Sequence, residues 1–452
     1  MNSIFDNDFS ENTLVEQTAI ALFRDMGWGY ANCFHEFEQP GGSPLGRQTK
    51  SVVILESRLR PVLKKLNSGL PGEALSQAIE EISRDRSLMS AVQANREVYT
   101  LLKDGVKVKV SDDNGNETTK VVQVIDWENP GNNDFFLASQ FWVTGEMYSK
   151  RPDLVGFVNG LPILLVEFKA VHKNLKTAFD DNITDYKDTI PQIFPYNALL
   201  LVSHGTDSRI GTITAEWENF ADWKKINSEG EEGIVSLETM VRGVCQPDRL
   251  LDIIENFTVF QEVRGGLIKL VSKNHQYLGV NNAIQALKEI RTREGKLGVF
   301  WHTQGSGKSV SMIFFAQKVL RKVPGNWTFV IVTDRLELDD QIYKNFTSAG
   351  VITENKAQAE SGEHLRQLLR EDHRYVFTLI HKFRIPEMIS DRSDIIVITD
   401  EAHRSQYDTL AMNMRMALPN ASFMAFTGTP LIVTEEKTRE VFGDYISIYN
   451  FK

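Results

Sequence analysis

The sequence predicts an α/β protein of two domains, in which an α+β domain is followed by a doubly wound parallel sheet. Three observations support this prediction. The chain has 452 residues, which exceeds the size of one ordinary hydrophobic core. Its first half mixes helical and strand patterns without a βαβ rhythm, whereas its second half alternates short apolar strands with helical segments. Near-continuous apolar strands that alternate with helices are typical of a parallel sheet covered on both faces.

The composition is that of a soluble globular protein, with 42% hydrophobic and 24% charged residues. The start of the chain lacks a basic segment followed by an apolar run, and no apolar run reaches membrane-spanning length. Cys33 and Cys245 are too far apart in sequence to suggest a disulfide framework or a thiolate metal site. We therefore expect a cytoplasmic protein with no membrane partner. Because the net charge is -10, a nucleic acid would have to be bound through local basic patches.

The first domain is expected to span residues 1–260 and to mix helices with antiparallel strands. Its boundary falls in a segment of looser patterning, which ends near Gly265-Gly266, a predicted hinge. The expected elements are helices within 11–30 and 72–103, a hairpin of 106–110 with 120–127, a strand at 134–143, a loop at 226–233 and a helix at 248–257.

A second hairpin in this domain brings charged residues together. Asp153 begins an apolar strand, and Asn159-Gly160 is a strong turn signal. Residues 161–169 return as a strand that carries Glu167 and Lys169, which are two residues apart and therefore share one face. Two carboxylates and a lysine on one face suit phosphodiester cleavage. Asp153 and Glu167 would bind Mg²⁺, while Lys169 would stabilise charge or position a water molecule.

The register of this hairpin decides whether the two carboxylates can share a metal ion. With a two-residue turn and regular pairing, Asp153 lies opposite Val166, on the face away from Glu167. A longer turn or a single bulge moves the pairing by one residue and places Asp153 opposite Glu167. We therefore predict that the turn is longer than two residues, or that a bulge lies between residues 153 and 167.

This hairpin resembles the PD-(D/E)xK nucleases. The apolar run 163–166 would bury the strand and hold Glu167 at its end. Downstream, Asn182 and Tyr186 match the spacing of the QxxxY element that some of these nucleases carry, with Asn in place of Gln. Glu16 on the first helix is a candidate for a further metal contact, but we expect it to lie on a solvated helix face. An edge strand with alternating charges is the alternative interpretation of the hairpin.

The second domain, expected at residues 261–452, contains a glycine loop between a strand and a helix. The apolar residues 299–301 lead into Gly305-Ser306-Gly307-Lys308-Ser309, and apolar residues then recur at helical spacing. Backbone N–H groups can converge on an anion where no side chain intrudes, and a helix N-terminus adds a favourable dipole. We therefore predict an ATP site formed by this loop and Thr303. Lys308 would reach the β- and γ-phosphates, and Ser309 would bind Mg²⁺. His302 stands where the strict phosphate-loop pattern has glycine.

Carboxylates follow a later apolar strand of the same domain. Further strands are expected at 328–333, 375–380, 394–399 and 422–427. Asp400, Glu401 and His403 come directly after the third of these. Because ligands bind beyond the carboxyl ends of strands in open parallel sheets, both carboxylates should face the glycine loop. Asp400 would hold Mg²⁺ through water, and Glu401 would orient or deprotonate the attacking water. An acidic helix cap is the alternative interpretation.

The glycine loop, the Asp400-Glu401-Ala402-His403 segment and Thr427-Gly428-Thr429-Pro430 resemble motifs I, II and III of superfamily 2 helicases and translocases. The resemblance implies one RecA-like lobe, with Thr427, Gly428 and Thr429 coupling ATP to movement. It also implies that His403 contacts ATP and that Gln276 recognises adenine. The alternative interpretation of Gln276 is a solvated polar side chain. Contacts with the DNA backbone are implied for Thr333, Arg335, Thr378 and Lys382.

Motors of this kind close ATP between two lobes, and the second lobe supplies an arginine finger. This sequence continues for only 22 residues after Pro430. We therefore expect a fragment, which alone binds ATP weakly and hydrolyses it poorly.

A PD-(D/E)xK domain followed by such a motor resembles the restriction (motor) subunit of type I restriction-modification enzymes, over essentially the whole chain. The resemblance implies ATP and Mg²⁺ as cofactors, and cleavage of unmodified foreign double-stranded DNA after ATP-driven translocation. It also implies methyltransferase and specificity subunits as partners. Two alternatives remain: a DNA remodelling or repair translocase whose first domain only binds DNA, and an ATPase switch that does not act on DNA. The recognition sequence, cleavage position and oligomeric state do not follow from the sequence.

Overall fold

The computed structural model describes residues 11–38, 42–111, 116–352, 358–400, 407–429 and 435–450, and the chain forms two compact units. Unit 1 comprises the residues up to 226 together with 231–255 and 267–271, and unit 2 comprises 227–230, 256–266 and the residues from 272 onward. The chain therefore alternates between the units several times between residues 226 and 272, around the predicted boundary at 260. No helix in the described ranges is both long and apolar enough to cross a membrane.

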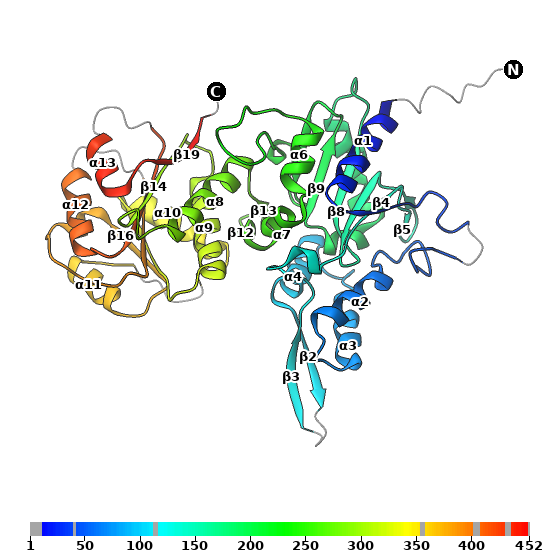
Figure 1. Cartoon of the computed structure of the whole chain (residues 1–452), viewed down its shortest axis with the longest axis horizontal. Helices are drawn as coiled ribbons and strands as arrows, with labels where there is room; N and C mark the ends of the chain where they lie inside the picture. Colours follow the sequence, from blue (N-terminus) through cyan, green and yellow to red (C-terminus); the bar gives the residue numbers. More distant parts are fainter. Residues whose placement is uncertain are drawn as a thin grey trace. The chain divides into compact units, whose positions relative to one another are not determined.

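A seven-stranded mixed sheet forms the centre of unit 1 (Figure 1). Its strand order is β1-β4-β7-β8-β9-β10-β11; the pairs β1-β4 and β8-β9 are parallel and the other neighbours are antiparallel. This mixture confirms the predicted α+β architecture. The strands are β1 (Gly29–Asn32), β4 (Phe135–Ser139), β7 (Leu154–Val158), β8 (Leu161–Phe168), β9 (Leu199–Ser203), β10 (Ser208–Gly211) and β11 (Ala221–Asp222).

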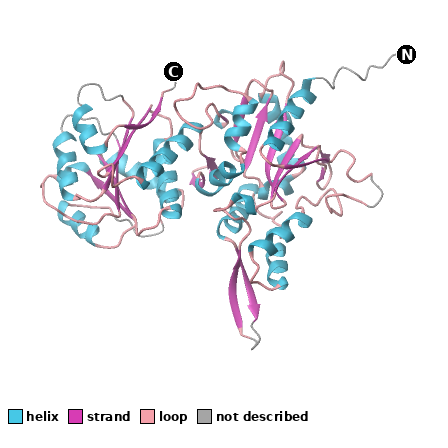
Figure 2. Cartoon of the chain, in the orientation of Figure 1, coloured by secondary structure: helices cyan, strands magenta, loops and turns pink. Residues whose placement is uncertain are grey.

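Helices and two hairpins surround this sheet (Figure 2). The hairpin of β2 (Val106–Ser111) and β3 (Glu117–Val122) confirms the prediction for this segment and extends away from the sheet of unit 1 (Figure 1). A short hairpin of β5 (Val143–Thr144) and β6 (Ser149–Lys150) follows β4. The helices are α1 (Glu11–Asp25), α2 (Glu56–Leu66), α3 (Gly72–Ser83), α4 (Ala91–Asp104), the 3₁₀ turns Pro130–Asn132, Pro191–Tyr196 and Trp217–Asn219, the π-helix Ala178–Ile183, α5 (Thr184–Thr189), α6 (Leu237–Val244) and α7 (Pro247–Asn256).

One prediction about local structure is corrected, and a second is located in the fold. The strand expected at 134–143 is divided, because Gln140 adopts a left-handed backbone conformation with φ of 55° and ends the run after β4. Gly265-Gly266, the predicted hinge, lies in the tight turn between β12 (Thr258–Val263) and β13 (Gly266–Val271), which form a two-stranded sheet.

Unit 2 contains a six-stranded sheet in the order β16-β15-β17-β18-β14-β19, and all its neighbouring pairs are parallel. Helices lie on both faces of this sheet (Figure 2), so the predicted doubly wound fold is confirmed. The strands are β14 (Lys296–His302), β15 (Thr328–Thr333), β16 (Tyr375–Leu379), β17 (Ile395–Asp400), β18 (Ser422–Thr427) and β19 (Tyr445–Tyr449). The helices are α8 (Asn274–Lys288), α9 (Lys308–Lys322), α10 (Leu336–Ser348), α11 (Gly362–Arg370), the 3₁₀ turn Ile380–Phe383, α12 (Tyr407–Ala417) and α13 (Glu435–Phe442).

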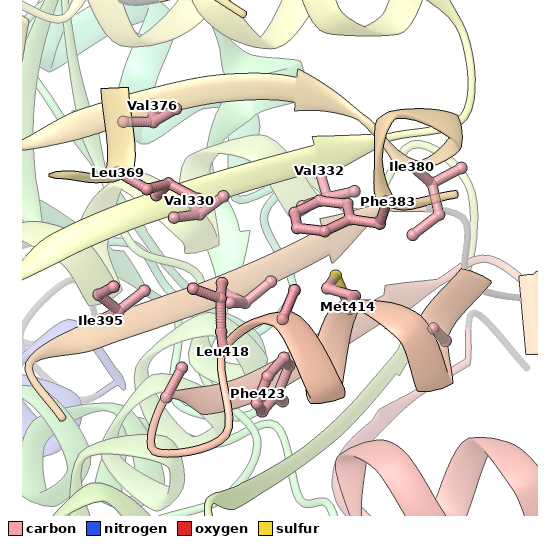
Figure 3. Close-up of a cluster of buried hydrophobic side chains, with 14 of the residues drawn as sticks. Val330, Val332, Leu369, Val376, Ile380, Phe383, Ile395, Met414, Leu418 and Phe423 are labelled. Carbon is pink, nitrogen blue, oxygen red and sulfur yellow. The ribbon is translucent and has the colours of Figure 1, made fainter. Parts of the chain in front are cut away.

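One hydrophobic core holds α11, α12 and α13 against the sheet of unit 2 (Figure 3). Val330, Val397 and Phe423 project from the central strands, and Leu369 and Met414 meet them from α11 and α12. Burying each such side chain contributes about 1.5–3 kcal/mol, so the cluster fixes the central strands firmly. Their carboxyl ends, where ligands bind in sheets of this type, are thereby held in place.

Candidate functional site

The hairpin of β7 and β8 has a tight turn and an irregular register. Its turn consists of Asn159 and Gly160, with φ of 53° and 79°, as a two-residue type I′ turn requires. The register then shifts between Gly156 and Phe157, so that β8 carries one extra residue, Ile163. This is a β-bulge, the second of the two alternatives that the sequence predicted.

The bulge brings Asp153 and Glu167 together where β7 begins and β8 ends. The Asp153 backbone N–H donates to Glu167 Oε1 over 3.2 Å, and the Phe168 backbone N–H donates to Asp153 Oδ2 over 2.8 Å. The prediction that a bulge lies between residues 153 and 167 is therefore confirmed. Two carboxylates converge within unit 1, each fixed by the backbone of the partner strand.

Burial perturbs the protonation of this pair. Glu167 is only 1% exposed, and this burial, followed by the charge of Asp153, raises its pKa well above the usual value. Burial also raises the pKa of Asp153, although the Phe168 N–H and the charges of Lys169 and Arg151 oppose the rise. Two adjacent buried carboxylates cannot both carry an uncompensated charge, so the pair favours a shared proton or a bound cation.

Asn182 links Glu167 to Lys169. Its Nδ2 donates to Glu167 Oε2 over 2.9 Å, and Lys169 Nζ donates to Asn182 Oδ1 over 2.6 Å. Asn182 Nδ2 also lies 3.4 Å from Tyr186 Oη, one helical turn further along the chain. The asparagine that stands in place of glutamine thus supplies an amide that orients both an acid and a lysine.

Glu16 lies beside the carboxylate pair, which corrects the expectation of a solvated helix face. Its side chain is half-buried and accepts a hydrogen bond from Gln140 Nε2 over 3.0 Å. Burial, and to a lesser extent the charge of Asp153, raise the pKa of Glu16. The expectation was wrong because α1 packs against β1 and β8, so the border of its buried face reaches the site. Val15, which is buried next to Glu16, is the sequence signal that could have revealed this border.

The predicted phosphate loop lies at the carboxyl end of β14 in unit 2. Gly305 and Gly307 have φ of 83° and 87°, a conformation that glycine adopts without strain. Gly307 is the N-cap of α9, so strand, loop and helix follow one another as predicted. The hydroxyls of Thr303 and Ser306 are buried and have no hydrogen-bond partner within the described part of the chain.

Two side chains from α8 hold this loop in shape. Gln276 Nε2 donates to the Gly307 carbonyl over 3.1 Å, and Gln276 Oε1 accepts the Lys273 backbone N–H over 2.9 Å. His275 Nε2 donates to the Ser306 carbonyl over 3.1 Å, and burial lowers the pKa of His275 to about 4. Gln276 is 3% exposed and supports the loop through its amide; the adenine contact stays a prediction.

His302 occupies the position at which the strict loop pattern has glycine. Its side chain is fully buried and shares a hydrogen bond of 2.6 Å with the Ser447 hydroxyl of β19. Burial, followed by the charges of His275 and Lys308, lowers the pKa of His302 to about 3, so the ring is neutral. The departure from the pattern is therefore accommodated by the edge strand β19.

Asp400 ends β17 at the same edge of the sheet as the glycine loop. It is 5% exposed and pairs with Phe426 of β18, the strand that separates β17 from β14. The structure thus brings Asp400 and the loop to neighbouring positions, one strand apart. Glu401 and His403 lie outside the described residues.

The proposed DNA-contact residues lie in the carboxyl halves of β15 and β16 or just after them. Thr333 and Thr378 are fully buried, whereas the Arg335 side chain is 50% exposed and forms an ion pair with Asp334. Lys382 donates to the Ala359 carbonyl, so its ammonium group is already engaged. Contact with DNA stays a prediction for these residues.

The segment after β18 forms a tight turn. Thr427 Oγ1 donates to the Thr429 carbonyl over 2.9 Å and accepts the Thr429 N–H over 3.3 Å, so Gly428 is enclosed between the two threonines. This turn shares the ligand-binding edge of the sheet with Asp400. Pro430 lies outside the described residues.

Comparison with known proteins relates the two units to two families. Residues 8–219 match the family described as type I restriction enzyme R protein N terminus, and residues 275–452 match the SWI2/SNF2 ATPase family. The type I restriction enzyme HindI endonuclease subunit of Haemophilus influenzae is 36% identical over 97% of this chain. A protein of Methanocaldococcus jannaschii, named as a MjaIXP type I restriction endonuclease subunit, is 32% identical over 97% of this chain. The chain spans 44% of the length of each of these relatives.

Solved structures show weaker similarity. A fragment of an HsdR subunit of a type I restriction enzyme from Vibrio vulnificus YJ016 is 15% identical, with 70% of this chain and 54% of that chain covered. The TM-score is 0.29.

Proposed function

Because residues 8–219 belong to the N-terminal family of type I restriction enzyme R proteins, we propose that this chain cleaves unmodified foreign double-stranded DNA as part of an ATP-dependent restriction enzyme. The single observation that carries this proposal is the bulge that places Asp153 opposite Glu167. The match of residues 275–452 to the SWI2/SNF2 ATPases supports the accompanying proposal of ATP-driven movement along DNA.

The carboxylate pair fits a magnesium ion. Carboxylate oxygens are the ligands that Mg²⁺ prefers, and the burial of Asp153 and Glu167 disfavours two adjacent negative charges unless a cation is present. Among the residues that the structure describes, no group of three His, Cys, Asp or Glu forms a metal cage. Mg²⁺ is commonly held by one or two carboxylates plus water and substrate phosphate, so a pair suffices.

Each residue of the nuclease site has a proposed role. Bound Mg²⁺ would polarise the scissile phosphodiester and lower the pKa of water. Asp153 and Glu167 would hold this ion, since the backbone N–H groups of the partner strands orient their oxygens. Lys169, which Asn182 orients, stabilises the charge that develops on the phosphate or positions the attacking water. Tyr186 supports Asn182 as an accessory residue.

The nucleotide site uses the loop and Asp400. The buried hydroxyls of Thr303 and Ser306, which lack hydrogen-bond partners in the described chain, fit a polyphosphate that brings acceptors to this loop. Lys308 would bind the β- and γ-phosphates, and Ser309 and Asp400 would hold the accompanying Mg²⁺.

The remaining proposed roles in the motor depend on the resemblance to superfamily 2. Glu401 would orient the attacking water, and His403 and Gln276 would contact the nucleotide. The turn of Thr427, Gly428 and Thr429 would couple the nucleotide site to the proposed DNA-contact residues, which are Thr333, Arg335, Thr378 and Lys382. Methyltransferase and specificity subunits are the proposed partners, and the cytoplasm is the proposed location.

The proposal is tested with Asp153→Asn in the assembled enzyme. Cleavage of unmodified DNA should be lost while ATP-driven movement along DNA continues, because the change affects only unit 1. Cleavage at the wild-type rate would contradict the nuclease assignment. The first domain would then be a DNA-binding module on a translocase.

A further inference from the structure

Two cations of unit 1 that share one aromatic ring form no ion pair within the described chain. Arg151 and Lys50 form no ion pair, and their side chains donate no hydrogen bond to any described residue. Both lie over the Trp142 ring, with Lys50 Nζ 4.6 Å and Arg151 Cζ 5.2 Å from its centroid. The chain has 60 acidic residues, yet neither of these two neighbouring cations lies within ion-pair distance of a described carboxylate.

Aromatic rings and backbone hydrogen bonds fix both cations in place. Arg151 Cζ also lies 4.5 Å from the centroid of Phe34, and Trp142 Nε1 donates to the Phe34 carbonyl over 3.1 Å. The Thr144 backbone N–H donates to the Lys50 carbonyl over 3.1 Å, which ties the Lys50 segment to β5. A cation that interacts with an aromatic face keeps its N–H donors available for an anion.

Arg151 also lies close to the nuclease site. It precedes Asp153 by two residues, and its charge lowers the pKa of Asp153 and of Glu16, in opposition to the effect of burial. Arg151 therefore acts on these carboxylates electrostatically, although it forms no ion pair with either. An anion bound by this guanidinium group would therefore lie next to the segment that carries Asp153.

We propose that Arg151 and Lys50, held over Trp142, form a phosphate-binding surface that positions the DNA backbone at the Asp153-Glu167 site. The guanidinium group can bind two phosphate oxygens at once, and the ammonium group adds a point charge. A phosphodiester strand is the partner that fits both this surface and the neighbouring carboxylates. The inference rests on the proposed nuclease function, and this surface would position the DNA substrate of that function.

The salt dependence of DNA binding tests this surface directly. The 452-residue protein is titrated onto a short fluorescent duplex without divalent metal, at several salt concentrations. Each phosphate contact contributes about 0.9 to the slope of log affinity against log salt. Arg151→Ala and Lys50→Ala should each lower the slope by about 0.9 and weaken binding about tenfold at 0.1 M salt, and the double variant should lower it by about 1.8. Arg151→Lys should keep the slope because it keeps the charge.

The matched control is Lys109→Ala, which removes an exposed lysine of β2 that pairs with Glu117 over 3.2 Å. It should leave the slope unchanged. A double variant that has the wild-type melting temperature and the wild-type slope would overturn the proposed surface. If the double variant unfolds, the single variants and the slope of Arg151→Lys decide the question.

Failure of this inference is separable from failure of the nuclease proposal. Glu167→Gln should keep the salt dependence of DNA binding while losing cleavage. Cleavage at the wild-type rate by Glu167→Gln contradicts the nuclease proposal alone, and unchanged slopes in the Arg151 and Lys50 variants contradict the surface alone.

Discussion

Replacing Glu167 with glutamine should stabilise the fold and abolish DNA cleavage. The register of Leu154 with Val166 continues to Asp153 and Glu167, whose side chains therefore lie on one face. Directly opposed residues have Cβ atoms about 5 Å apart, and two unit charges at this distance repel by about 3 kcal/mol at an effective dielectric constant of 20. The glutamine Oε1 can still accept a hydrogen bond from the Asp153 N–H. Its amide nitrogen would face the Asn182 donor, and the loss of that hydrogen bond offsets about 1 kcal/mol of the relieved repulsion. At a pH where both carboxylates of the wild type are ionised, the expected gain in the free energy of unfolding is therefore about 2 kcal/mol.

The gain should depend on pH with a definite sign. The pKa of Glu167 is raised in the folded state, so the folded protein binds more protons than the unfolded chain at pH values above the ordinary value of 4.5. Wild-type stability therefore falls as pH rises from about 4.5 through the raised folded pKa, and then stays constant. Glu167→Gln removes this fall. The variant should gain little at pH 4 and gain progressively more as pH rises above 4.5.

Urea unfolding at pH 4 and pH 8, with and without Mg²⁺, measures these effects. Mg²⁺ at ten times its Kd should stabilise the wild type by about 1.4 kcal/mol and leave the variant unchanged. Glu56→Gln is the matched control, because Glu56 is an exposed glutamate of the same unit that pairs with Arg60. A Glu167→Gln variant with the same pH dependence and the same response to Mg²⁺ as the wild type would refute the reasoning.

Three further predictions concern other buried or charged groups. Lys308→Ala should weaken ATP binding at least about tenfold in calorimetry and abolish ATP-driven movement of the assembled enzyme; normal movement would reject the phosphate-loop assignment. Burial lowers the pKa of Lys269 from 10.5 to about 7, so stability should rise by about 1.4 kcal/mol per pH unit between these values, and Lys269→Met should flatten this rise in denaturant unfolding. His302→Gly should cost about 2–4 kcal/mol in thermal unfolding because the fully buried ring leaves a cavity, and an unchanged Tm would contradict its structural role.

The register of the β7-β8 hairpin was predictable from the sequence in one respect and not in another. Strict alternation of side chains meant that Asp153 and Glu167 could share a face only with a longer turn or a bulge, so the requirement was predictable. The position of the bulge was not, because Ile163 and its neighbours are all apolar and any of them could be the extra residue.

Strands of unit 2 were predictable because each buried run is apolar at nearly every position, as in β15 and β18. The edge strand β19 was missed, since it mixes buried and exposed residues, and the four-residue β1 was too short to leave a pattern.

Residues that join the nuclease site from distant segments were the hardest to predict. A helical pattern shows which face of α1 is buried, but not that Glu16 meets Gln140 across the sheet. The same limit applies to Arg151, whose proximity to Phe34 depends on a contact between segments more than one hundred residues apart.

The central claim, that Asp153 and Glu167 hold one divalent metal ion, is tested most directly by crystals of this protein soaked in Mn²⁺ and measured at an anomalous wavelength. The expected result is an anomalous peak that lies about 2.1 Å from one oxygen of each carboxylate, the distance typical of Mg²⁺ and its ligands. A fully ordered hairpin with no peak between the two carboxylates, at a Mn²⁺ concentration that supports DNA cleavage in solution, would contradict the claim.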